Sequence, residues 1–581
     1  MSDPTPFDWL DPEKRVSGRR TGKVRTYTPA PDMQVKGASR LREVLARLGY
    51  QDMRRGQDNA IMSLLGCTDT YCVLPTSLGK TAIYVVPTLC HNWRTLIFSP
   101  LVALMKDQVE NLHRLKLAAA QLSSGQHHME NRRALHDWET GNLSFLLAAP
   151  ERMEIGDFMD VMLRTKPDMV ALDEAHCLSQ WGDSFRPAYT KIGEFLEKVN
   201  PRVVVTLTAT ATEDVEDDIR TILGLPMARK VVYYPKRENL VMTTIRRDMS
   251  PVKYMDGMDQ EVLKQVNAIK GPTVVYCATR ATCEYLAEEL GKDITGDALY
   301  YHAGLTPDQR TINQDHFMTN TVRVMFATNA FGLGVNKPDI RGIIHRDVCG
   351  SIAALVQEQG RAGRDGEHSD CIMLYDPDTV GLEEWKINTT YPPKSHVERV
   401  FHQLSRMADS NKRVQITLKK LAEVVGLKEK VIGSCIGILQ AGGAVGRVQE
   451  GENCARIKII NDDVPDPISK VIIGTLNTIG NCRPDGYIEF PLRNLSDACC
   501  LKVKDLTGRL ERLQSDGCIS YCPPYRGKTT EIVGDLSGVD FPRLEQRRRD
   551  AMDKLKEVKD FIDVPDEEKH DFLLEYFGMK E

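Results

Sequence analysis

The chain has 581 residues, of which 41% are hydrophobic and 27% charged, and its formal net charge is −5 at pH 7. This length predicts roughly three to five domains, and this composition is typical of globular proteins rather than of disordered or fibrous chains. No run of about 18 apolar residues is present, so no membrane-spanning segment is expected. The first 15 residues lack the apolar core of a signal peptide. An intracellular protein is therefore expected, in the cytoplasm or at the nucleoid if the source is a prokaryote or a virus.

The 15 cysteines are scattered, and several, such as Cys72, Cys277 and Cys371, lie in apolar runs. Reduced buried thiols are therefore expected rather than a disulfide framework. The small negative net charge gives no sign of a surface coated in nucleic acid, although local basic grooves are compatible with it. Residues 1–38 are rich in proline, glycine and basic side chains, which favours a disordered basic tail; a phosphate-binding arm is the alternative.

Two series of short apolar runs alternate with helical patterns, one in residues 39–226 and one in residues 227–385. The first contains TYCVLP, TLIFSP, SFLLAAP, DMVALDE and RVVVTLTAT, and the second contains TVVYC, ALYYHA, VRVMFAT, IRGIIHRD and DCIMLY. Because these runs are apolar almost throughout, they predict strands buried on both faces of a parallel sheet. The sequence therefore predicts an α/β fold with two doubly wound parallel-sheet domains in tandem.

The stretch VLPTSLGKT, from Val73 to Thr81, follows a predicted strand and precedes a predicted helix. It has the Gly-Lys-Thr end of a phosphate-binding loop, but Leu74 stands at the position of the first glycine. Backbone N–H groups at a helix start bind phosphate, Lys80 can reach the β- and γ-phosphates of ATP, and Thr81 can hold Mg²⁺. A bare Gly-Lys-Thr is common by chance, so the assignment depends on the motifs downstream. The candidate nucleotide-binding residues are Pro75, Thr76, Ser77, Leu78, Gly79, Lys80 and Thr81.

The motif ALDEAH places Asp173 and Glu174 at the end of a buried strand, on the edge of the sheet where α/β folds keep their sites. Asp173 is expected to complete the Mg²⁺ shell, directly or through water. Glu174 is expected to orient and deprotonate the water that attacks the γ-phosphate. His176 closes the same motif and is counted with the candidate catalytic residues. The alternative is a pair of acids that caps the next helix.

The motif QEQGRAGRDG, which begins at Gln357, places Arg361 and Arg364 three residues apart on one side of a predicted helix. An ordinary solvated helix face is the alternative. An arginine supplied from a second domain is worth about 10³–10⁵ in the rate of phosphoryl transfer. If these arginines complete the site, hydrolysis depends on closure of the two domains. Gln357, Arg361 and Arg364 are therefore candidate catalytic residues, and the two arginines are also candidate nucleotide ligands.

These motifs, together with SPLVALMKDQV, APER, TLTATAT, YHAGL and ATNAFGLGVNKPDIR, resemble those of a superfamily 2 helicase. The segment CLSQWGDSFRPAY resembles the aromatic-rich loop of the RecQ family of DNA helicases. The resemblance extends from about Leu41 to Pro377 and implies two RecA-like domains that use ATP and Mg²⁺ and move 3′ to 5′. It also implies single-stranded and duplex or branched DNA as partners. No membrane is expected as a partner, and the sequence identifies no protein partner.

The resemblance implies roles for further residues of the nucleotide site. In LGYQDMRRGQ, the residues Tyr50, Arg54 and Gln57 stand at the matching places of the family's adenine-reading segment. Gly334 is a further candidate nucleotide ligand. The segment TLTATAT, with Thr208, is implied to link the nucleotide site to the DNA strand.

The resemblance also implies that Trp181, Phe185 and Arg186 contact single-stranded DNA, where base stacking on an aromatic ring is worth about 1–3 kcal/mol. Tyr189, at the end of the same stretch, is expected on the same surface for a flat, anionic ligand. A buried aromatic cluster under a surface turn is the alternative. Further candidate strand contacts are Arg152, His302 and Thr328.

Beyond the second domain, residues 386–465 and 466–540 each have the outline of a winged helix, and residues 541–581 are expected to be helical and charged. The stretch GRVQEGENCARIKII predicts a hairpin in the first of these regions. SYCPPYRGKTTEI is the candidate strand-separating wing, with Tyr521 and Tyr525 available to stack on a base pair; a structural hairpin with packed tyrosines is the alternative. The usual zinc site of the family is not expected, and core thiols are favoured for Cys499, Cys500, Cys518 and Cys522.

Two stretches depart from the family pattern. Ser77 and Leu78 stand where the family usually has glycines, and Asp183 and Ser184 stand where it usually has His and Asp. The preferred interpretation is an ATP-dependent DNA helicase. The alternatives are a translocase or annealing motor on branched DNA with little net unwinding, a scaffold that binds ATP without hydrolysing it, and an RNA helicase.

Overall fold

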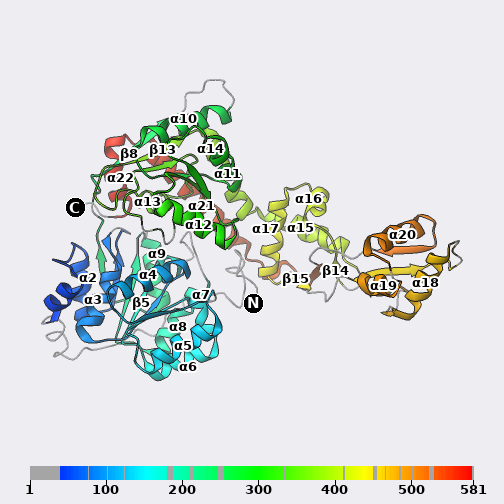
Figure 1. Cartoon of the computed structure of the whole chain (residues 1–581), viewed down its shortest axis with the longest axis horizontal. Helices are drawn as coiled ribbons and strands as arrows, with labels where there is room; N and C mark the ends of the chain where they lie inside the picture. The colour runs from blue at the N-terminus through cyan, green and yellow to red at the C-terminus, as the bar shows by residue number, and fades with distance from the viewer. Residues whose placement is uncertain are drawn as a thin grey trace. The chain divides into compact units, whose positions relative to one another are not determined.

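The computed structural model divides the chain into two compact units (Figure 1). It describes residues 40–578 apart from 76–77, 101, 124, 179–186, 210–212, 235, 247–253, 333–334, 336, 410–411, 449–453, 463, 465, 480, 483–485, 500 and 523–528. The larger unit contains the described parts of residues 16–387 and 548–581, and the smaller one contains 388–547. Among the described helices, none is both long enough and apolar enough to cross a membrane.

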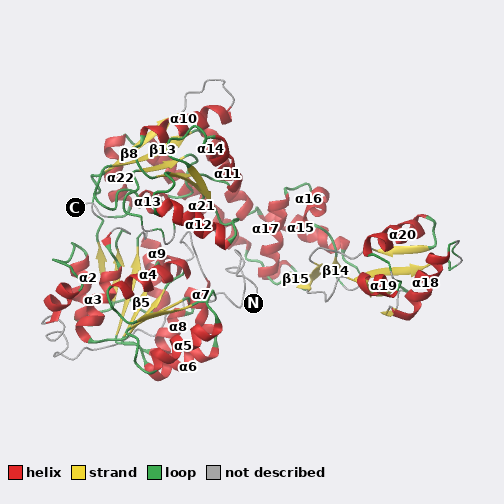
Figure 2. Cartoon of the chain, viewed as in Figure 1, coloured by secondary structure: helices red, strands yellow, loops and turns green. Residues whose placement is uncertain are grey.

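The first lobe of the larger unit is a seven-stranded sheet with the order β3-β4-β2-β5-β6-β1-β7, in which every neighbouring pair is parallel. Successive residues of one strand enter different hydrophobic cores: Ile97 packs in one, while Leu96 and Phe98 pack in the other. Helices therefore cover both faces (Figure 2). The strands are β1 Thr70–Val73, β2 Thr95–Phe98, β3 Ala119–Leu122, β4 Phe145–Ala148, β5 Met169–Leu172, β6 Val203–Thr208 and β7 Arg229–Val232. The helical segments are α2 Gln57–Leu65, α3 Thr81–His91, α4 Val102–Arg114, α5 His128–Glu139, η3 Pro150–Glu154, α6 Gly156–Thr165, η4 Ala175–Leu178, α7 Pro187–Thr190, α8 Ile192–Val199 and α9 Glu213–Leu223.

The second lobe is a six-stranded sheet with the order β10-β11-β9-β12-β13-β8, again parallel throughout. The predicted α/β fold with two tandem parallel sheets is thus confirmed. The strands are β8 Leu240–Arg246, β9 Thr273–Tyr276, β10 Ala298–Tyr301, β11 Val324–Ala327, β12 Gly342–His345 and β13 Ser369–Tyr375. The helices are α10 Tyr254–Ala268, α11 Arg280–Glu289, α12 Pro307–Met318, α13 Ile352–Gln359 and α14 Pro377–Thr390.

Three strands were not predicted, and each of them lies at the edge of its sheet. These strands are β3, β7 and β8. These three strands have exposed or half-exposed positions and lack the continuous apolar run by which the other strands were recognised. Because β7 pairs with β1, the first sheet extends to Val232, beyond the boundary predicted at residue 226.

In the smaller unit, one sheet-and-helix module is inserted into another. The first module contains α15 Lys394–Met407, α16 Leu418–Val425 and α17 Glu429–Ala441, and its antiparallel sheet has the order β14-β20-β15. The second module contains α18 Pro467–Ile479, α19 Leu492–Ala498 and α20 Val503–Ser515, and its sheet has the order β17-β18-β16-β19. The strands are β14 Arg413–Val414, β15 Val445–Val448, β16 Cys454–Ile459, β17 Asn481–Cys482, β18 Ile488–Pro491, β19 Ile519–Cys522 and β20 Thr529–Ile532.

This topology corrects two predictions. The expected hairpin within GRVQEGENCARIKII does not form, because β15 pairs with β20 whereas β16 pairs with β18 and β19. The candidate wing SYCPPYRGKTTEI is also not a hairpin, since its flanks β19 and β20 belong to different sheets. Tyr521 is buried in the core of the second module, together with Cys518, and is not available to stack on DNA. Tyr525 and Cys500 lie outside the described residues.

The C-terminal helical segment returns to the second lobe. It consists of α21 Phe541–Asp563, η6 Asp566–Glu568 and α22 Lys569–Tyr576. The Asp566 carboxylate accepts a hydrogen bond from the Thr244 backbone N–H at 3.1 Å, and Lys569 Nζ donates to Thr244 Oγ1 at 2.6 Å. His570 is hydrogen-bonded to the Leu240 carbonyl at 3.0 Å. These contacts cover the edge strand β8, whose unpaired backbone groups would otherwise be open to pairing with another chain.

Candidate active site

The phosphate loop connects β1 to α3. The Leu74 N–H donates to the Thr208 carbonyl at 2.9 Å, which ties the start of the loop to β6. Gly79 has a φ of +71°, and a Cβ there would lie 3.2 Å from Gln57 Nε2, so this position requires glycine. Lys80 is the N-cap of α3 and Thr81 is its first residue. Pro75 and Leu78 are buried, whereas Thr76 and Ser77 lie outside the described residues.

The segment that resembles the adenine-reading region contacts this loop. Gln57, at the start of α2, is buried, and its amide donates to the carbonyls of Leu78 and of Gly79, the latter at 3.1 Å. Its Oε1 accepts from the Arg54 N–H at 3.0 Å. Tyr50 is 40% exposed. Gln57 therefore joins the predicted base-reading segment to the phosphate loop.

Asp173 follows the last residue of β5 and is held from several sides. Its Oδ1 accepts from the Glu174 N–H at 3.0 Å, and its Oδ2 accepts from Gln108 Nε2 at 2.9 Å. Its own N–H donates to the Phe98 carbonyl at 2.8 Å. Burial raises the pKa of the Asp173 carboxyl, and the charge of the neighbouring Glu174 raises it further. A cation at this position would relieve both effects.

Glu174 has a φ of +49°, a left-handed conformation that non-glycine residues seldom adopt. Its carboxylate lies 3.7 Å from Lys80 Nζ and 3.3 Å from His176 Nδ1. Burial alone would raise the pKa of Glu174, but the charges of Lys80, His176 and Arg361 together lower it below its ordinary value. The buried carboxylate is therefore kept in its charged, proton-accepting form.

The residues present fit a magnesium nucleotide. Lys80 Nζ is buried and has no hydrogen-bond partner among the described residues, as expected for an ammonium that awaits phosphate oxygens. Gln108 Oε1, an acceptor, is likewise buried without a hydrogen-bond partner among the described residues. The Thr81 hydroxyl and the Asp173 carboxylate supply the oxygen ligands that Mg²⁺ prefers.

The two arginines of the second lobe do not lie on a helix, which corrects the prediction from their spacing. The helix α13 ends at Gln359, and both arginines follow in turns. Arg361 is buried and donates to the Gly332 carbonyl, while its Nε has no partner among the described residues. Arg364 donates to the Val335 carbonyl at 3.0 Å, and burial together with the nearby charges of Arg361 and Arg237 lowers its pKa to about 10.

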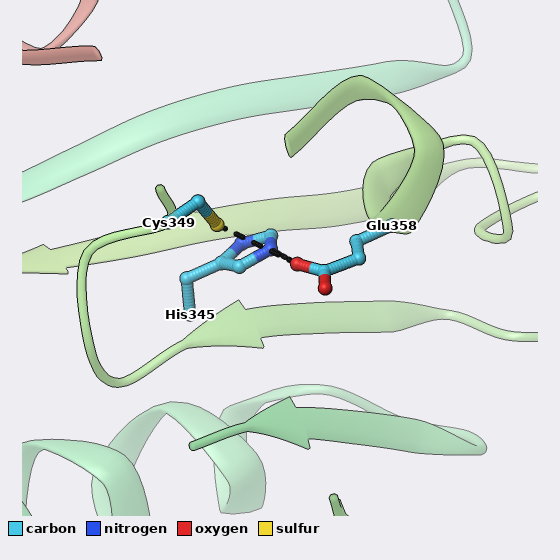
Figure 3. A group of neighbouring side chains, drawn as sticks. All are labelled: His345, Cys349 and Glu358. Carbon is cyan, nitrogen blue, oxygen red and sulfur yellow. Dashed lines mark hydrogen bonds and ion pairs between the residues drawn. The ribbon is translucent and has the colours of Figure 1, made fainter. Parts of the chain in front are cut away.

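Three side chains missed by the sequence analysis hold α13 in place (Figure 3). His345, at the end of β12, is hydrogen-bonded through Nε2 to Glu358 Oε2 at 2.9 Å, and the Cys349 thiol donates to the same oxygen at 3.5 Å. Their donor atoms lie within 4.8 Å of one another. One carboxylate oxygen thus joins β12, the following turn and α13 just before Arg361.

The comparisons with known proteins agree with this geometry. The DEAD/DEAH box helicase model matches residues 54–218, and the helicase conserved C-terminal domain model matches residues 257–366. The ATP-dependent DNA helicases RecQ of Bacillus subtilis (strain 168) and Pasteurella multocida (strain Pm70) are 33% and 35% identical over 361 and 356 residues. The probable ATP-dependent DNA helicase RecS of Bacillus subtilis is 34% identical over 366 residues, which are 63% of this chain and 72% of that protein. The chain belongs to the RecQ family.

The two RecQ relatives extend beyond the matched region. Their alignments cover 62% and 61% of this chain, and the chain spans 59% and 55% of their lengths. The smaller unit, residues 388–547, lies outside both matched family models. The matched models lie within the two parallel-sheet lobes and include Lys80, Asp173, Glu174 and Arg361 of the candidate site.

Several of the residues that are predicted to contact a DNA strand cannot be placed in the structure. Trp181, Phe185 and Arg186, and the candidate nucleotide ligand Gly334, lie outside the described residues. Tyr189 is fully buried, and its hydroxyl donates to the Asp173 carbonyl at 3.1 Å. Its predicted place on the DNA-facing surface is therefore wrong, and the alternative of a buried aromatic holds for this residue.

The other candidate strand residues are less exposed than the RecQ resemblance implies. His302 is buried and is hydrogen-bonded to Glu284 Oε1 at 2.8 Å, so contact with a strand would require this pair to open. Arg152 and Thr328 are half-buried, the first in η3 and the second directly after β11. Their roles at the strand stay predictions.

One hydrogen bond and one shared cavity connect the candidate site to neighbouring segments of the fold. His176 Nδ1 is hydrogen-bonded to Thr208 Oγ1 at 3.1 Å, which joins the acid motif to the end of β6 and the segment TLTATAT. Gln357 and Gly360 of the second lobe line a cavity together with Pro75 and Ala209 of the first. The predicted catalytic residue Gln357 therefore lies beside the phosphate loop.

Proposed function

We propose that this RecQ-family protein is an ATP-dependent DNA helicase that moves 3′ to 5′ on single-stranded DNA and unwinds duplex DNA in recombination, repair or replication. The observation that carries the proposal is the set of basic side chains around Glu174. Lys80 from the phosphate loop, His176 from the acid motif and Arg361 from the second lobe all lower the pKa of this buried carboxylate. Residues of both lobes thus act on one proton acceptor.

The arrangement supports hydrolysis of a phosphoanhydride. Glu174 is charged in a buried site, so it can take a proton from the attacking water. Lys80 Nζ, without a hydrogen-bond partner among the described residues, is available to the β- and γ-phosphates. Mg²⁺, when held by Thr81 and Asp173, supplies charge neutralisation at the phosphates. Arg361 approaches from the other lobe and would stabilise the charge that develops in the transition state.

The names of the relatives support DNA as the substrate. The matching proteins from Bacillus subtilis and Pasteurella multocida are named ATP-dependent DNA helicases. The direction of movement and the pathway are taken from the RecQ resemblance. The stretch Trp181–Arg186 begins eight residues after Asp173, and Tyr189, three residues past its end, donates a hydrogen bond to the Asp173 carbonyl. This arrangement supports coupling between strand binding and hydrolysis.

The test is steady-state ATP hydrolysis with and without single-stranded DNA, followed by unwinding of duplexes with 3′ and 5′ overhangs. Wild type is expected to be strongly stimulated and to unwind the 3′ overhang. Lys80→Ala and Glu174→Gln should abolish hydrolysis, and Phe185→Ala should lose the stimulation by DNA while it keeps the basal rate. Equal stimulation of wild type and Phe185→Ala would show that Phe185 does not couple DNA binding to ATP hydrolysis.

A translocase or annealing motor on branched DNA is the second candidate, and one observation favours it. The predicted strand-separating wing does not form, because β19 and β20 belong to different sheets and Tyr521 is buried. A protein of this kind would hydrolyse ATP on branched DNA and move the branch point but would release little single strand from an overhang duplex. Comparing branch migration with overhang unwinding, on strands of the same sequence, separates the two functions.

A further inference from the structure

Gln108 is a polar side chain in the buried stripe of α4. Met105 and Leu112, one turn away on either side, are fully buried in the hydrophobic core of the first lobe. Burying an amide among such residues is costly unless its polar atoms are satisfied. Gln108 Nε2 is satisfied by Asp173 Oδ2 at 2.9 Å, but Oε1 is buried without a hydrogen-bond partner among the described residues. The amide therefore has one satisfied end, at Asp173, and one end that can still accept a hydrogen bond.

We propose that Gln108 is a positioning residue for the Mg²⁺ site: it holds the Asp173 carboxylate in the orientation that receives the ion, and its free carbonyl oxygen accepts a hydrogen bond from a water on the ion. This inference rests on the proposed ATP-dependent function. It assigns a role to a residue that is 65 positions away from the acid motif in the sequence.

The geometry at Asp173 supports this role. A carboxylate has about four lone-pair sites, and here the Glu174 N–H occupies one on Oδ1 while Gln108 occupies one on Oδ2. The two bonds fix the plane of the carboxylate and leave its remaining lone pairs for a cation or a metal-bound water.

The chemistry of Gln108 Oε1 supports the second part of the proposal, the hydrogen bond from a water on the ion. A carbonyl oxygen accepts hydrogen bonds, and Mg²⁺ usually keeps several of its waters when it binds to protein and phosphate. Outer partners of this kind orient metal ligands, and their loss typically weakens metal affinity by about 10–100-fold. A purely structural bridge between α4 and β5 would instead affect stability without any dependence on Mg²⁺.

The test is binding of a fluorescent ADP to the full chain, without DNA, as a function of Mg²⁺ concentration. Gln108→Met keeps the length of the side chain but has no amide, and Gln108→Asn keeps an amide that is one methylene too short. Both variants should need about 10–100-fold more Mg²⁺ for half-maximal enhancement of ADP binding, while their affinity for ADP without Mg²⁺ stays at the wild-type value. Thermal unfolding followed by circular dichroism shows that the variants are folded.

Tyr189→Phe is the matched control, because it removes a hydrogen bond to the backbone carbonyl of the same Asp173 but none to its carboxylate. Its Mg²⁺ requirement should equal that of wild type. Wild-type Mg²⁺ dependence in both Gln108 variants would overturn the inference, and so would an equal loss in Tyr189→Phe. Failure of the wild type to hydrolyse ATP would instead overturn the proposed function, so the two failures are distinguishable.

Discussion

The Tyr189 hydroxyl donates a hydrogen bond to the backbone carbonyl of Asp173 at 3.1 Å, and the tyrosine is fully buried. Tyr189 lies in α7, directly after the stretch that contains Trp181, Phe185 and Arg186, so it connects the end of that stretch to the acid motif. We expect Tyr189→Phe to reduce the stimulation of ATP hydrolysis by single-stranded DNA several-fold and to leave the basal rate unchanged. The loss of the bond should also lower the free energy of unfolding by about 1 kcal/mol. Steady-state hydrolysis and denaturant unfolding check both; an unchanged stimulation would restrict Tyr189 to packing.

Arg361 should be required for catalysis rather than for nucleotide binding. Its guanidinium lies in the second lobe, is buried and acts on Glu174. Arg361→Ala should lower kcat by about 10³-fold or more, because the charge that develops in the transition state loses its partner from the second lobe. ADP affinity should change far less. Lys236→Ala is the control, since it removes an exposed cation of the same lobe that pairs with Asp571 at 3.0 Å.

The pH dependence of hydrolysis should reflect the lowered pKa of Glu174. A base must be deprotonated to act, so wild-type kcat should be held at neutral and mildly acidic pH and should fall only below the ordinary glutamate pKa of about 4.3. His176→Ala removes one of the cations that lower this pKa, so the acidic limb should move to higher pH. Profiles of kcat for the two proteins measure the shift. An acidic limb at the same pH in both would exclude His176 as a cause.

The Glu358 carboxylate should be needed to place Arg361. Glu358 lies three residues before this arginine, and its carboxylate accepts hydrogen bonds from both His345 and Cys349. Glu358→Ala leaves the buried His345 ring without this partner, which should cost about 1–3 kcal/mol in stability and also reduce kcat at least tenfold. Cys349→Ser keeps a donor at the same place and should retain most of the activity. Unfolding curves and steady-state kinetics of the two variants provide the comparison.

Removal of η6 and α22 should expose the edge of the second sheet. Asp566 and Lys569 bind the backbone and the hydroxyl of Thr244 in β8. A chain that ends at residue 563 is expected to aggregate at concentrations at which wild type stays monodisperse, because an uncovered edge strand pairs with other chains. Light scattering measures this. A monodisperse truncated protein would show that β8 is protected in another way.

The inner strands and the acid motif could be predicted because their information is local. A continuous apolar run identifies a buried parallel strand, and Asp173 and Glu174 directly follow one. The edge strand β8 could not be recognised in this way, since most of its positions are exposed or half-buried. Gln108 was present in a quoted motif, yet its partner is 65 residues away, and only the fold brings the two side chains together.

The two arginines, the expected hairpin and Tyr189 show the opposite case. A local pattern was present in the sequence, but the structure that it suggested did not form. The three-residue spacing of Arg361 and Arg364 suggested a helix, but α13 ends at Gln359. The stretch GRVQEGENCARIKII suggested a hairpin, but β15 pairs with β20 and β16 pairs with β18 and β19. Tyr189 lies in an aromatic-rich segment that suggested a ligand-binding surface. Its side chain is instead buried, and its hydroxyl has a backbone partner inside the lobe.

The order of synthesis has a consequence for the smaller unit. β20 is the middle strand of its sheet, and β14 and β15 pair only with it among the described strands. A ribosome therefore has to make the whole second module, from β16 to β19, before β14 and β15 can find the strand that joins them. The inserted module can fold as soon as it emerges, while the module that begins earlier in the chain finishes later. A released chain that ends at residue 522 should accordingly protect Ile457 and Phe490 from proteolysis while Val414 and Val445 remain cleavable.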